Sequence, residues 1–380
     1  MQYDVLVVGA GSMGMAAGYF LAKSGKRVLL LDSSHPPHQR GSHHGETRII
    51  RHAYAEGSLY VPFVLRAQEL WTSLERESGK SLFLKTGVLS VGKEESKLVQ
   101  GTLKSAEAYQ LPLEVLNAND IHHRYPGVNV QPGYVGCFEP NSGVLRCEES
   151  IDAYRTLAES YGATIIGDTS VQDVEIHKDS VTVFTKTDTY NAHSLVVTSG
   201  AWAQEMLAKL DLTVPLTPLR KTFAWYNADE RHYGSEQFPA FAFETENGLY
   251  YGFPSIDGAG LKVGRHDGGV PVNPNHDLQP FGARKEDEED LHTFLRHSLP
   301  KVGNLTYGKT CLYTMTPDDR FIIDRHPRHE HVAIAAGFSG HGFKFSSAVG
   351  QALSQLIISG NTDIDLSAFS CRRFNLNEYY

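Results

Sequence analysis

The chain has 380 residues, of which 41% are hydrophobic and 21% are charged, a composition typical of a globular protein with about two domains. Its formal net charge of −9 gives no general attraction to nucleic acid or to an anionic membrane surface. No apolar stretch approaches the length of a membrane span, so we expect no membrane partner.

The first predicted element is a β-strand that runs into a glycine-rich turn. Gly9, Gly11 and Gly14 have the spacing G-x-G-x-x-G, and a helix over Met13–Lys23 is expected to follow. In this setting Gly9 makes the tight turn and Gly11 lets the backbone approach a pyrophosphate. Gly14 lets the helix pack closely on the strand. The pattern predicts a dinucleotide-binding βαβ unit of the Rossmann type.

Asp32 ends the next apolar run and therefore the predicted second strand. A carboxylate at this position can accept hydrogen bonds from the ribose hydroxyls of an adenosine, and its charge repels a 2′-phosphate. NADP is therefore disfavoured, whereas NAD and FAD both remain compatible with the turn.

Three histidines and two arginines lie within residues 41–52. No cysteine or regularly spaced carboxylate completes a metal site with the histidines, and we expect no metal. A solvated basic loop is the plain alternative. Because the protein is acidic overall, we instead expect Arg48 and Arg51 to bind a pyrophosphate or a substrate carboxylate by paired hydrogen bonds.

The rest of the chain interleaves predicted helices and strands. The helices are expected over 60–77, 150–161 and 346–358, and the strands over 85–91, 171–176, 181–184, 194–200 and 331–336. Apolar strands from the beginning, middle and end favour one parallel sheet. We therefore predict an α/β fold with a discontinuous nucleotide-binding domain at 1–85, 142–215 and 310–380. Aromatic, alternating runs place an antiparallel-sheet substrate domain at 86–141 and 216–309.

The four cysteines are Cys137, Cys147, Cys311 and Cys371. They form no C-x-x-C pair and are too few to cross-link a chain of this length, which fits a reducing compartment and no zinc site. The chain begins with a predicted strand rather than with the basic and apolar segments of an export signal. We expect a cytoplasmic protein.

Several motifs together resemble the family of monomeric sarcosine oxidase and N-methyl-L-tryptophan oxidase. They are Gly9–Gly14, residues 41–52, Tyr250–Pro254, Gly308–Tyr313 and Gly337–Phe345, in the family's order and spacing, and the similarity extends to about residue 370. The family consists of FAD-dependent amine oxidases that demethylate secondary amino acids. The resemblance implies that the nucleotide domain is a Rossmann-like FAD-binding domain.

The resemblance also implies roles for individual residues. Cys311 would carry a thioether link to the 8α position of the flavin, although a lone cysteine is more commonly a small buried hydrophobe. Lys262, in an apolar strand, would lie over the flavin and promote its reaction with oxygen, whereas a lysine facing the surface is the alternative. Lys344 would pair with Arg51 on the substrate carboxylate.

The expected site contains three groups of residues. Catalytic roles are expected for Lys262, His266, Arg48 and His44. Substrate binding is expected from Arg51, Lys344, Tyr251, Tyr313 and Ala242. FAD binding is expected from Gly9, Gly11, Gly14, Asp32, Ser42, Thr47, Cys311, Gly340 and Gly342. Ala242 stands where sarcosine oxidases have a bulkier methionine, so we expect a larger pocket.

The predicted reaction converts an N-methyl amino acid and O2 into the primary amino acid, formaldehyde and hydrogen peroxide, on a monomeric enzyme. Sarcosine and N-methyl-L-tryptophan both remain candidate substrates, because different parts of the chain resemble different branches of the family. Another FAD amine oxidase, acting on glycine, a D-amino acid or a cyclic imino acid, is the nearest alternative. An NAD-dependent dehydrogenase and a ligand-binding protein without catalysis are the more distant ones.

Overall fold

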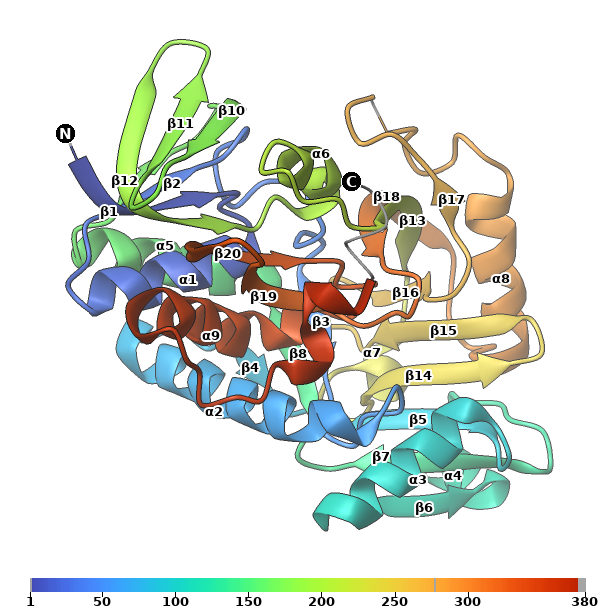
Figure 1. Ribbon diagram of the computed structural model, residues 1–380. Coiled ribbons are helices and arrows are strands. Elements are labelled where there is room, and N and C mark those ends of the chain that lie inside the picture. The colour runs from blue at the N-terminus through green and yellow to red at the C-terminus, as the bar shows by residue number, and fades with distance from the viewer. Residues whose placement is uncertain (1, 277, 375–380) are drawn as a thin grey trace.

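The computed structural model describes residues 2–276 and 278–374, in which three β-sheets carry helices on their faces (Figure 1). The first sheet has eight strands: β1 (Gln2–Val8), β2 (Val28–Leu31), β9 (Thr164–Ile166), β10 (Val171–Ile176), β11 (Val181–Thr185), β12 (Thr189–Val197), β19 (Ile322–His326) and β20 (His329–Ala336). β1 is parallel to β2 and β12, β12 is parallel to β20, and β2 is parallel to β9. The predicted α/β class is therefore confirmed.

The apolar strands β1 and β2 are buried because helices cover the sheet. The helices on one face are α1 (Ser12–Lys23), α2 (Val61–Ser78), α5 (Cys147–Ser160) and α9 (Ser346–Ser359), and Figure 1 shows them below the sheet. Helix α1 packs between α5 and α9. A Cβ on Gly350 would lie only 2.5 Å from the Cβ of Ala16, so this glycine permits the close approach of α9 to α1. The short α6 (Ala203–Ala208) follows β12.

The second sheet has nine strands: β5 (Val88–Lys93), β6 (Glu114–Asn117), β7 (Tyr134–Glu139), β13 (Thr217–Tyr226), β14 (Ala240–Thr245), β15 (Gly248–Phe253), β16 (Leu261–Arg265), β17 (Val270–Pro271) and β18 (Leu305–Met315). Its helices are α3 (Lys97–Tyr109), α4 (Ala118–Arg124), α7 (Glu230–Tyr233) and α8 (Glu286–Ser298). Neighbouring strands are antiparallel except β5 and β14, which are parallel. The antiparallel sheet predicted from the aromatic runs is therefore confirmed, except for the parallel pair of β5 and β14.

A third, small sheet joins the other two. It contains β3 (Thr47–Ile50), β4 (Phe83–Leu84) and β8 (Gly143–Arg146) in the order β3-β8-β4. The 3-10 helices are η1 (Ser58–Tyr60), η2 (Gly200–Trp202), η3 (Phe343–Phe345), η4 (Ser367–Phe369) and η5 (Cys371–Phe374). Strand β3 carries the histidine- and arginine-rich segment, so this sheet places the segment between the two larger sheets.

One predicted strand boundary and one predicted domain boundary can be compared with the elements of the structure. The strand predicted over 85–91 begins only at Val88, because Gly87 has a φ of +74°, which lies outside the extended region of a strand. The domain boundary predicted at residue 310 falls inside β18, which pairs with β13 along its length. Residues 1, 277 and 375–380, which belong to the predicted domain ranges, lie outside the described residues.

Candidate active site

The turn between β1 and α1 has the geometry that its glycines predict. Gly9 has a φ of +92°, and a Cβ on Gly14 would lie 1.8 Å from the carbonyl oxygen of Gly9, so neither position tolerates a side chain. Helix α1 begins after Gly11 without a side-chain cap. Its first backbone N–H groups and the positive end of its dipole are therefore available to an anion such as a pyrophosphate.

Asp32 lies directly after β2, beside this turn. Its Oδ2 accepts a hydrogen bond from the backbone N–H of Ala10 at 2.7 Å, and its Oδ1 accepts one from the N–H of Ser34 at 3.0 Å. The imidazole of His38 is 3.3 Å from Oδ1. Although burial opposes ionisation, His38 and the backbone donors lower the pKa of Asp32 below its ordinary value. The carboxylate is thus ionised and held at the position predicted for ribose recognition.

A cavity of about 510 Å³ begins at this turn and continues between the two large sheets. Among the predicted cofactor residues, Gly9, Gly11, Asp32, Ser42, Gly340 and Gly342 line it. Among the predicted substrate and catalytic residues, Arg48, Arg51, Ala242, Tyr251, His266, Tyr313 and Lys344 line it. Residues that are distant in the sequence therefore face one elongated cavity, with a nucleotide-type turn at one end.

Arg48 stabilises its own loop rather than pointing a free guanidinium into the cavity. Its Nη1 donates to the backbone oxygen of Thr47 at 2.8 Å, and its Nη2 donates to those of Ser42 and His44 at 2.8 and 2.9 Å. Glu148 accepts hydrogen bonds from the N–H groups of Gly45 and Glu46 on the other side of the loop. The loop is thereby fixed from both ends.

Lys262 lies on β16 with its ammonium buried beneath this loop. Its Nζ donates to the backbone oxygens of Gly45 and Thr47 at 2.5 and 3.1 Å, and to Thr47 Oγ1 at 3.2 Å. The rings of Phe223 and Phe253 lie within 4.7 Å of Nζ. Burial, reinforced by the charge of Arg48, lowers the pKa of Lys262 to about 7. The lysine does not face the surface.

Arg51 and Lys344 lie around the ring of Tyr54 at one wall of the cavity. The guanidinium carbon of Arg51 is 4.7 Å from the ring centre, and Lys344 Nζ is 5.3 Å from it. Arg51 Nη2 forms an ion pair with Glu56 at 2.6 Å, whereas the buried Nη1 has no partner among the described residues. Burial, reinforced by the positive charge of Arg51, lowers the pKa of Lys344 to about 7. This wall therefore offers one unpaired guanidinium nitrogen next to a second cationic group.

Aromatic side chains and His266 form a second part of the cavity wall. The ring of His266 lies 5.7 Å from that of Tyr313 and 6.5 Å from that of Tyr251, and Tyr313 Oη is 3.5 Å from His266 Nδ1. Burial lowers the pKa of His266 to about 4, so the imidazole is neutral near pH 7. Gly340, at a φ of +79°, lies against Tyr313, where a Cβ would be 2.2 Å from the ring. This part of the wall therefore offers aromatic surface beside a neutral hydrogen-bond acceptor.

Several predicted site residues do not line the cavity. Gly14 packs against the turn, and Thr47 holds Lys262. Cys311 is buried on β18, opposite Lys221 of β13. His44 is buried, and neither of its ring nitrogens has a partner in the described part of the chain. Burial lowers the pKa of His44 to about 3, so it is uncharged.

Four functional candidates were missed by the sequence analysis: Tyr54, Glu56, Lys221 and His341. Glu56 pairs with Arg51, and Lys221 Nζ donates to the backbone oxygens of His266, Asp267 and Gly268. Tyr54 Oη and His341 Nδ1 lie 2.6 Å apart. The only available signal was the pair of glycines that flank His341, and these do not identify a contact.

No group of three or more histidine, cysteine, aspartate or glutamate side chains is arranged to hold a metal ion within residues 2–276 and 278–374. In the same ranges, none of the helices has both the length and the apolar composition needed to cross a membrane.

Comparisons with known proteins agree with this architecture. The model of the FAD dependent oxidoreductase family (DAO) matches residues 4–356. The chain is 51% identical over 375 residues to the monomeric sarcosine oxidase of Bacillus sp. (strain NS-129), with 98% of this chain and 97% of that protein covered. It is 44% identical over 375 residues to the N-methyl-L-tryptophan oxidase of Yersinia pestis (strain Pestoides F), with 98% and 100% covered. The resemblance drawn from the motifs is therefore confirmed.

Solved structures share the fold. NikD, an unusual amino acid oxidase essential for nikkomycin biosynthesis, superposes with a TM-score of 0.86 at 25% identity over 97% of both chains. Glycine oxidase from Geobacillus kaustophilus superposes with a TM-score of 0.84 at 21% identity over 98% of this chain and 99% of that one. The second likeness concerns the fold alone.

These findings decide between the two nucleotides that the glycine turn left open. The turn, the uncapped start of α1 and Asp32 suit the ADP half that NAD and FAD share. The cavity then continues to the aromatic wall and to the unpaired nitrogen of Arg51. Together with the match over 4–356, this fit shows that the chain belongs to the family of FAD-dependent oxidoreductases.

Proposed function

We propose that this enzyme oxidises the N-methyl group of an N-methyl amino acid, with O2 as electron acceptor. The products are the primary amino acid, formaldehyde and hydrogen peroxide. The observation that carries the proposal is the buried, unpaired Nη1 of Arg51 next to Lys344, in the cavity that the aromatic side chains of Tyr251 and Tyr313 also line. A buried cationic donor without a partner is costly, and an amino acid carboxylate satisfies it.

The carboxylate of the substrate is bound by two groups. Arg51 offers Nη1, because Glu56 already occupies Nη2. Lys344 donates two hydrogen bonds within the protein, to the backbone oxygen of His341 at 3.0 Å and to Tyr54 Oη at 3.4 Å, which leaves one N–H for the substrate. Both donors converge on one side of the cavity and so fix the orientation of the amino acid.

The amine of the substrate lies toward His266. The neutral imidazole accepts a hydrogen bond without adding a competing positive charge, and Tyr251 and Tyr313 exclude water from the N-methyl group. When bound, FAD would supply the redox chemistry, that is, oxidation of the N-methyl group and transfer of the electrons to O2. The chain itself binds, orients and shields the reacting groups.

Lys262 provides a positive charge where oxygen is reduced. Its ammonium is held by three oxygen acceptors of the loop at Gly45 and Thr47, and the aromatic rings around it keep it from bulk water. A preorganised cation in such surroundings stabilises developing negative charge more strongly than one in water.

We further propose that FAD is attached covalently through Cys311 Sγ, as an 8α-S-cysteinyl link. The S–C bond would replace the S–H bond of the thiol and one C–H bond of the 8α-methyl group, and the two electrons and two protons released would pass to O2. Cys311 is buried within electrostatic reach of Arg48, Lys262 and Lys221. Burial raises the pKa of this thiol, and the three cations oppose that effect and favour the thiolate. The two residues that follow, Leu312 and Tyr313, line the cavity.

We also propose that the enzyme is a cytoplasmic monomer. Its four cysteines are free and buried, which suits a reducing compartment. Its 51% identical relative is named a monomeric sarcosine oxidase.

Peroxide release from a panel of amines tests the proposed function. Sarcosine and N-methyl-L-tryptophan are compared with glycine, L-proline and D-alanine. We expect peroxide and formaldehyde in equal amounts from at least one of the N-methyl substrates. Peroxide from glycine, proline or D-alanine alone would assign a different amine oxidase, and a purified protein without yellow colour would argue against FAD altogether.

A further inference from the structure

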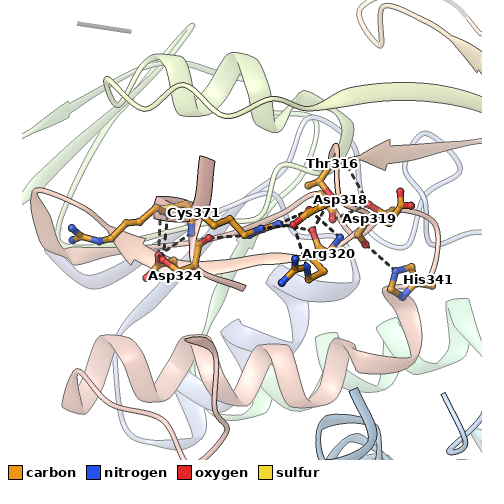
Figure 2. Close-up of polar contacts among 12 residues, drawn as sticks. Thr316, Asp318, Asp319, Arg320, Asp324, His341 and Cys371 are labelled. Atoms are coloured by element: carbon orange, nitrogen blue, oxygen red, sulfur yellow. Dashed lines mark hydrogen bonds and ion pairs between the residues drawn. The ribbon is translucent and has the colours of Figure 1, made fainter. Parts of the chain in front are cut away.

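A continuous chain of hydrogen bonds runs from Lys344 away from the cavity. Lys344 Nζ is 3.4 Å from Tyr54 Oη, and Tyr54 Oη is 2.6 Å from His341 Nδ1. The other ring nitrogen, His341 Nε2, is 3.2 Å from the backbone oxygen of Asp319, and Figure 2 shows the imidazole pointing toward Asp319. The chain thus connects the loop before η1, the glycine-rich turn before η3 and the loop between β18 and β19.

The donors and acceptors available in these groups fix the direction of each hydrogen bond in the series. The backbone oxygen of Asp319 can only accept, so His341 Nε2 carries the proton and donates it. Nδ1 of a neutral imidazole is then an acceptor, and Tyr54 must donate its hydroxyl proton to it. The oxygen of Tyr54 therefore turns its lone pairs toward the ammonium of Lys344.

The neutral state of His341 is favoured by its surroundings. Burial lowers the pKa of His341 to about 3, and the nearby cation of Lys344 acts in the same direction, while Glu56 opposes it. His266 is a further titratable group in its surroundings, and burial keeps it neutral near pH 7 as well. Protonation of His341 would turn Nδ1 into a donor, so the hydrogen bond with Tyr54 Oη would reverse and the hydroxyl proton of Tyr54 would lose its acceptor.

The end of the hydrogen-bonded series at His341 and Asp319 is held firmly by its neighbours. The ring of His341 lies 4.6 Å from that of Phe321 and 5.4 Å from that of Tyr60. The loop that presents Asp319 also contains Asp318 (Figure 2). Asp318 Oδ2 accepts a hydrogen bond from Arg373 Nε at 2.9 Å, which holds the loop in place. The backbone of Lys344 is fixed as well, because Trp71 Nε1 donates to its carbonyl oxygen at 2.8 Å.

We propose that Tyr54 and His341 are positioning residues, which hold the ammonium of Lys344 in the orientation that binds the substrate carboxylate. Two of the three N–H groups of Lys344 are directed into this chain and to the carbonyl oxygen of His341, so the third has a defined direction. This inference rests on the proposed function in one respect, namely that the ligand of Lys344 is a carboxylate.

Acetate binding to the FAD-loaded enzyme, followed through the absorbance change of the flavin, tests the inference. The variants are Tyr54→Phe, His341→Phe and both together, and Tyr60→Phe is the matched control, since Tyr60 lies beside Tyr54 at 4.9 Å between ring centres. We expect roughly tenfold weaker acetate binding in each single variant, the loss typical of a hydrogen bond to a charged group. KM for the N-methyl amino acid rises with the Kd, whereas kcat changes less.

The double variant shows whether Tyr54 and His341 act as one connected series of hydrogen bonds or as two independent contacts. Tyr54→Phe and His341→Phe combined should weaken binding no more than Tyr54→Phe alone, because both remove the same orientation of Lys344. Additive losses, equal weakening by Tyr60→Phe, or unchanged binding in Tyr54→Phe would each overturn the inference while leaving the proposed function intact. Failure of the unmodified enzyme both to bind acetate and to oxidise any N-methyl amino acid would overturn the inference and the proposed function together.

Discussion

The ammonium of Lys221 donates a hydrogen bond to the backbone oxygen of His266, with 3.1 Å between Nζ and O. It also binds the next two carbonyl oxygens, of Asp267 and Gly268, so all three of its donors are used by one loop. Burial lowers the pKa of Lys221 to about 8. A cation from β13 thus fixes the loop after β16, which presents the imidazole of the proposed substrate site.

Replacing Lys221 should change the acid limb of the pH profile. The positive charge of Lys221 contributes to the lowered pKa of His266, after burial, while Glu56 opposes it. In Lys221→Met the pKa of His266 rises, so the imidazole is protonated at higher pH and no longer accepts from the substrate amine. We expect the acid limb of kcat/KM to move upward by roughly one pH unit. Lys221→Arg keeps the charge and should keep the limb; an unchanged limb in Lys221→Met would exclude this role.

Local patterns predicted the fold well where each element is defined by its own residues. Helices α2 and α9 lie within one residue of their predicted ranges, and the glycine turn has its expected geometry. The parallel pairing of β5 with β14 was missed, because it joins residues about 150 positions apart. Nothing in either strand's own alternation encodes its partner.

The residues of the candidate site also fall into those that the sequence predicted and those that it missed. Arg51 and Lys344 were placed together by resemblance, and the structure brings both to the ring of Tyr54. Glu56 gave no signal, because a single acidic residue in a loop has no periodicity to interpret. Lys221 was missed because the loop at 266–268 covers it, and that loop becomes its neighbour only in the folded chain.

The proposed covalent link can be tested with a matched pair of cysteines. Cys311 and Cys147 are both buried, and both lie within electrostatic reach of Arg48 and Lys262. After acid precipitation, Cys311→Ala should give colourless protein and a yellow supernatant, whereas Cys147→Ala should keep the flavin on the protein. Release of flavin from the unmodified enzyme would show that the link is absent.

Ala242 should decide how large a substrate fits. It lines the cavity on β14, and the adjacent strand pairs it with Tyr251. A methionine at this position would extend into the space near Tyr251, so we expect Ala242→Met to lower kcat/KM for N-methyl-L-tryptophan by about tenfold or more. Sarcosine, which needs less room, serves as the internal control and should lose little. Equal effects on both substrates would mean that Ala242 does not set the size of the pocket.

Lys262→Met should slow the reaction with oxygen and spare the reaction with the amine. Anaerobic reduction of the flavin by substrate should keep its rate, whereas reoxidation should slow by about two orders of magnitude, since a preorganised charge is lost. Lys309→Met is the control, because Lys309 lies 5.5 Å from the ring centre of Trp225, and Lys262 lies 5.2 Å from the same centre. Stopped-flow absorbance separates the two half-reactions, and normal reoxidation in Lys262→Met would remove this lysine from the oxygen reaction.

The same lysine should leave a signature in the pH dependence of stability. Folding lowers the pKa of Lys262 from 10.5 to about 7, so between these values the unfolded chain binds one proton more than the folded chain. The free energy of unfolding of flavin-free protein therefore gains about 1.4 kcal/mol per pH unit from Lys262 as pH rises through this window. Lys344 and Lys221 add contributions of the same sign. Urea unfolding at pH 7.5 and 9.5 should show a smaller gain in Lys262→Met than in the unmodified protein. The exposed Lys285, whose pKa is raised by Glu289, is the control site, and Lys285→Met should show the full gain. An equal gain in Lys262→Met would mean that the ammonium is not desolvated as the structure shows.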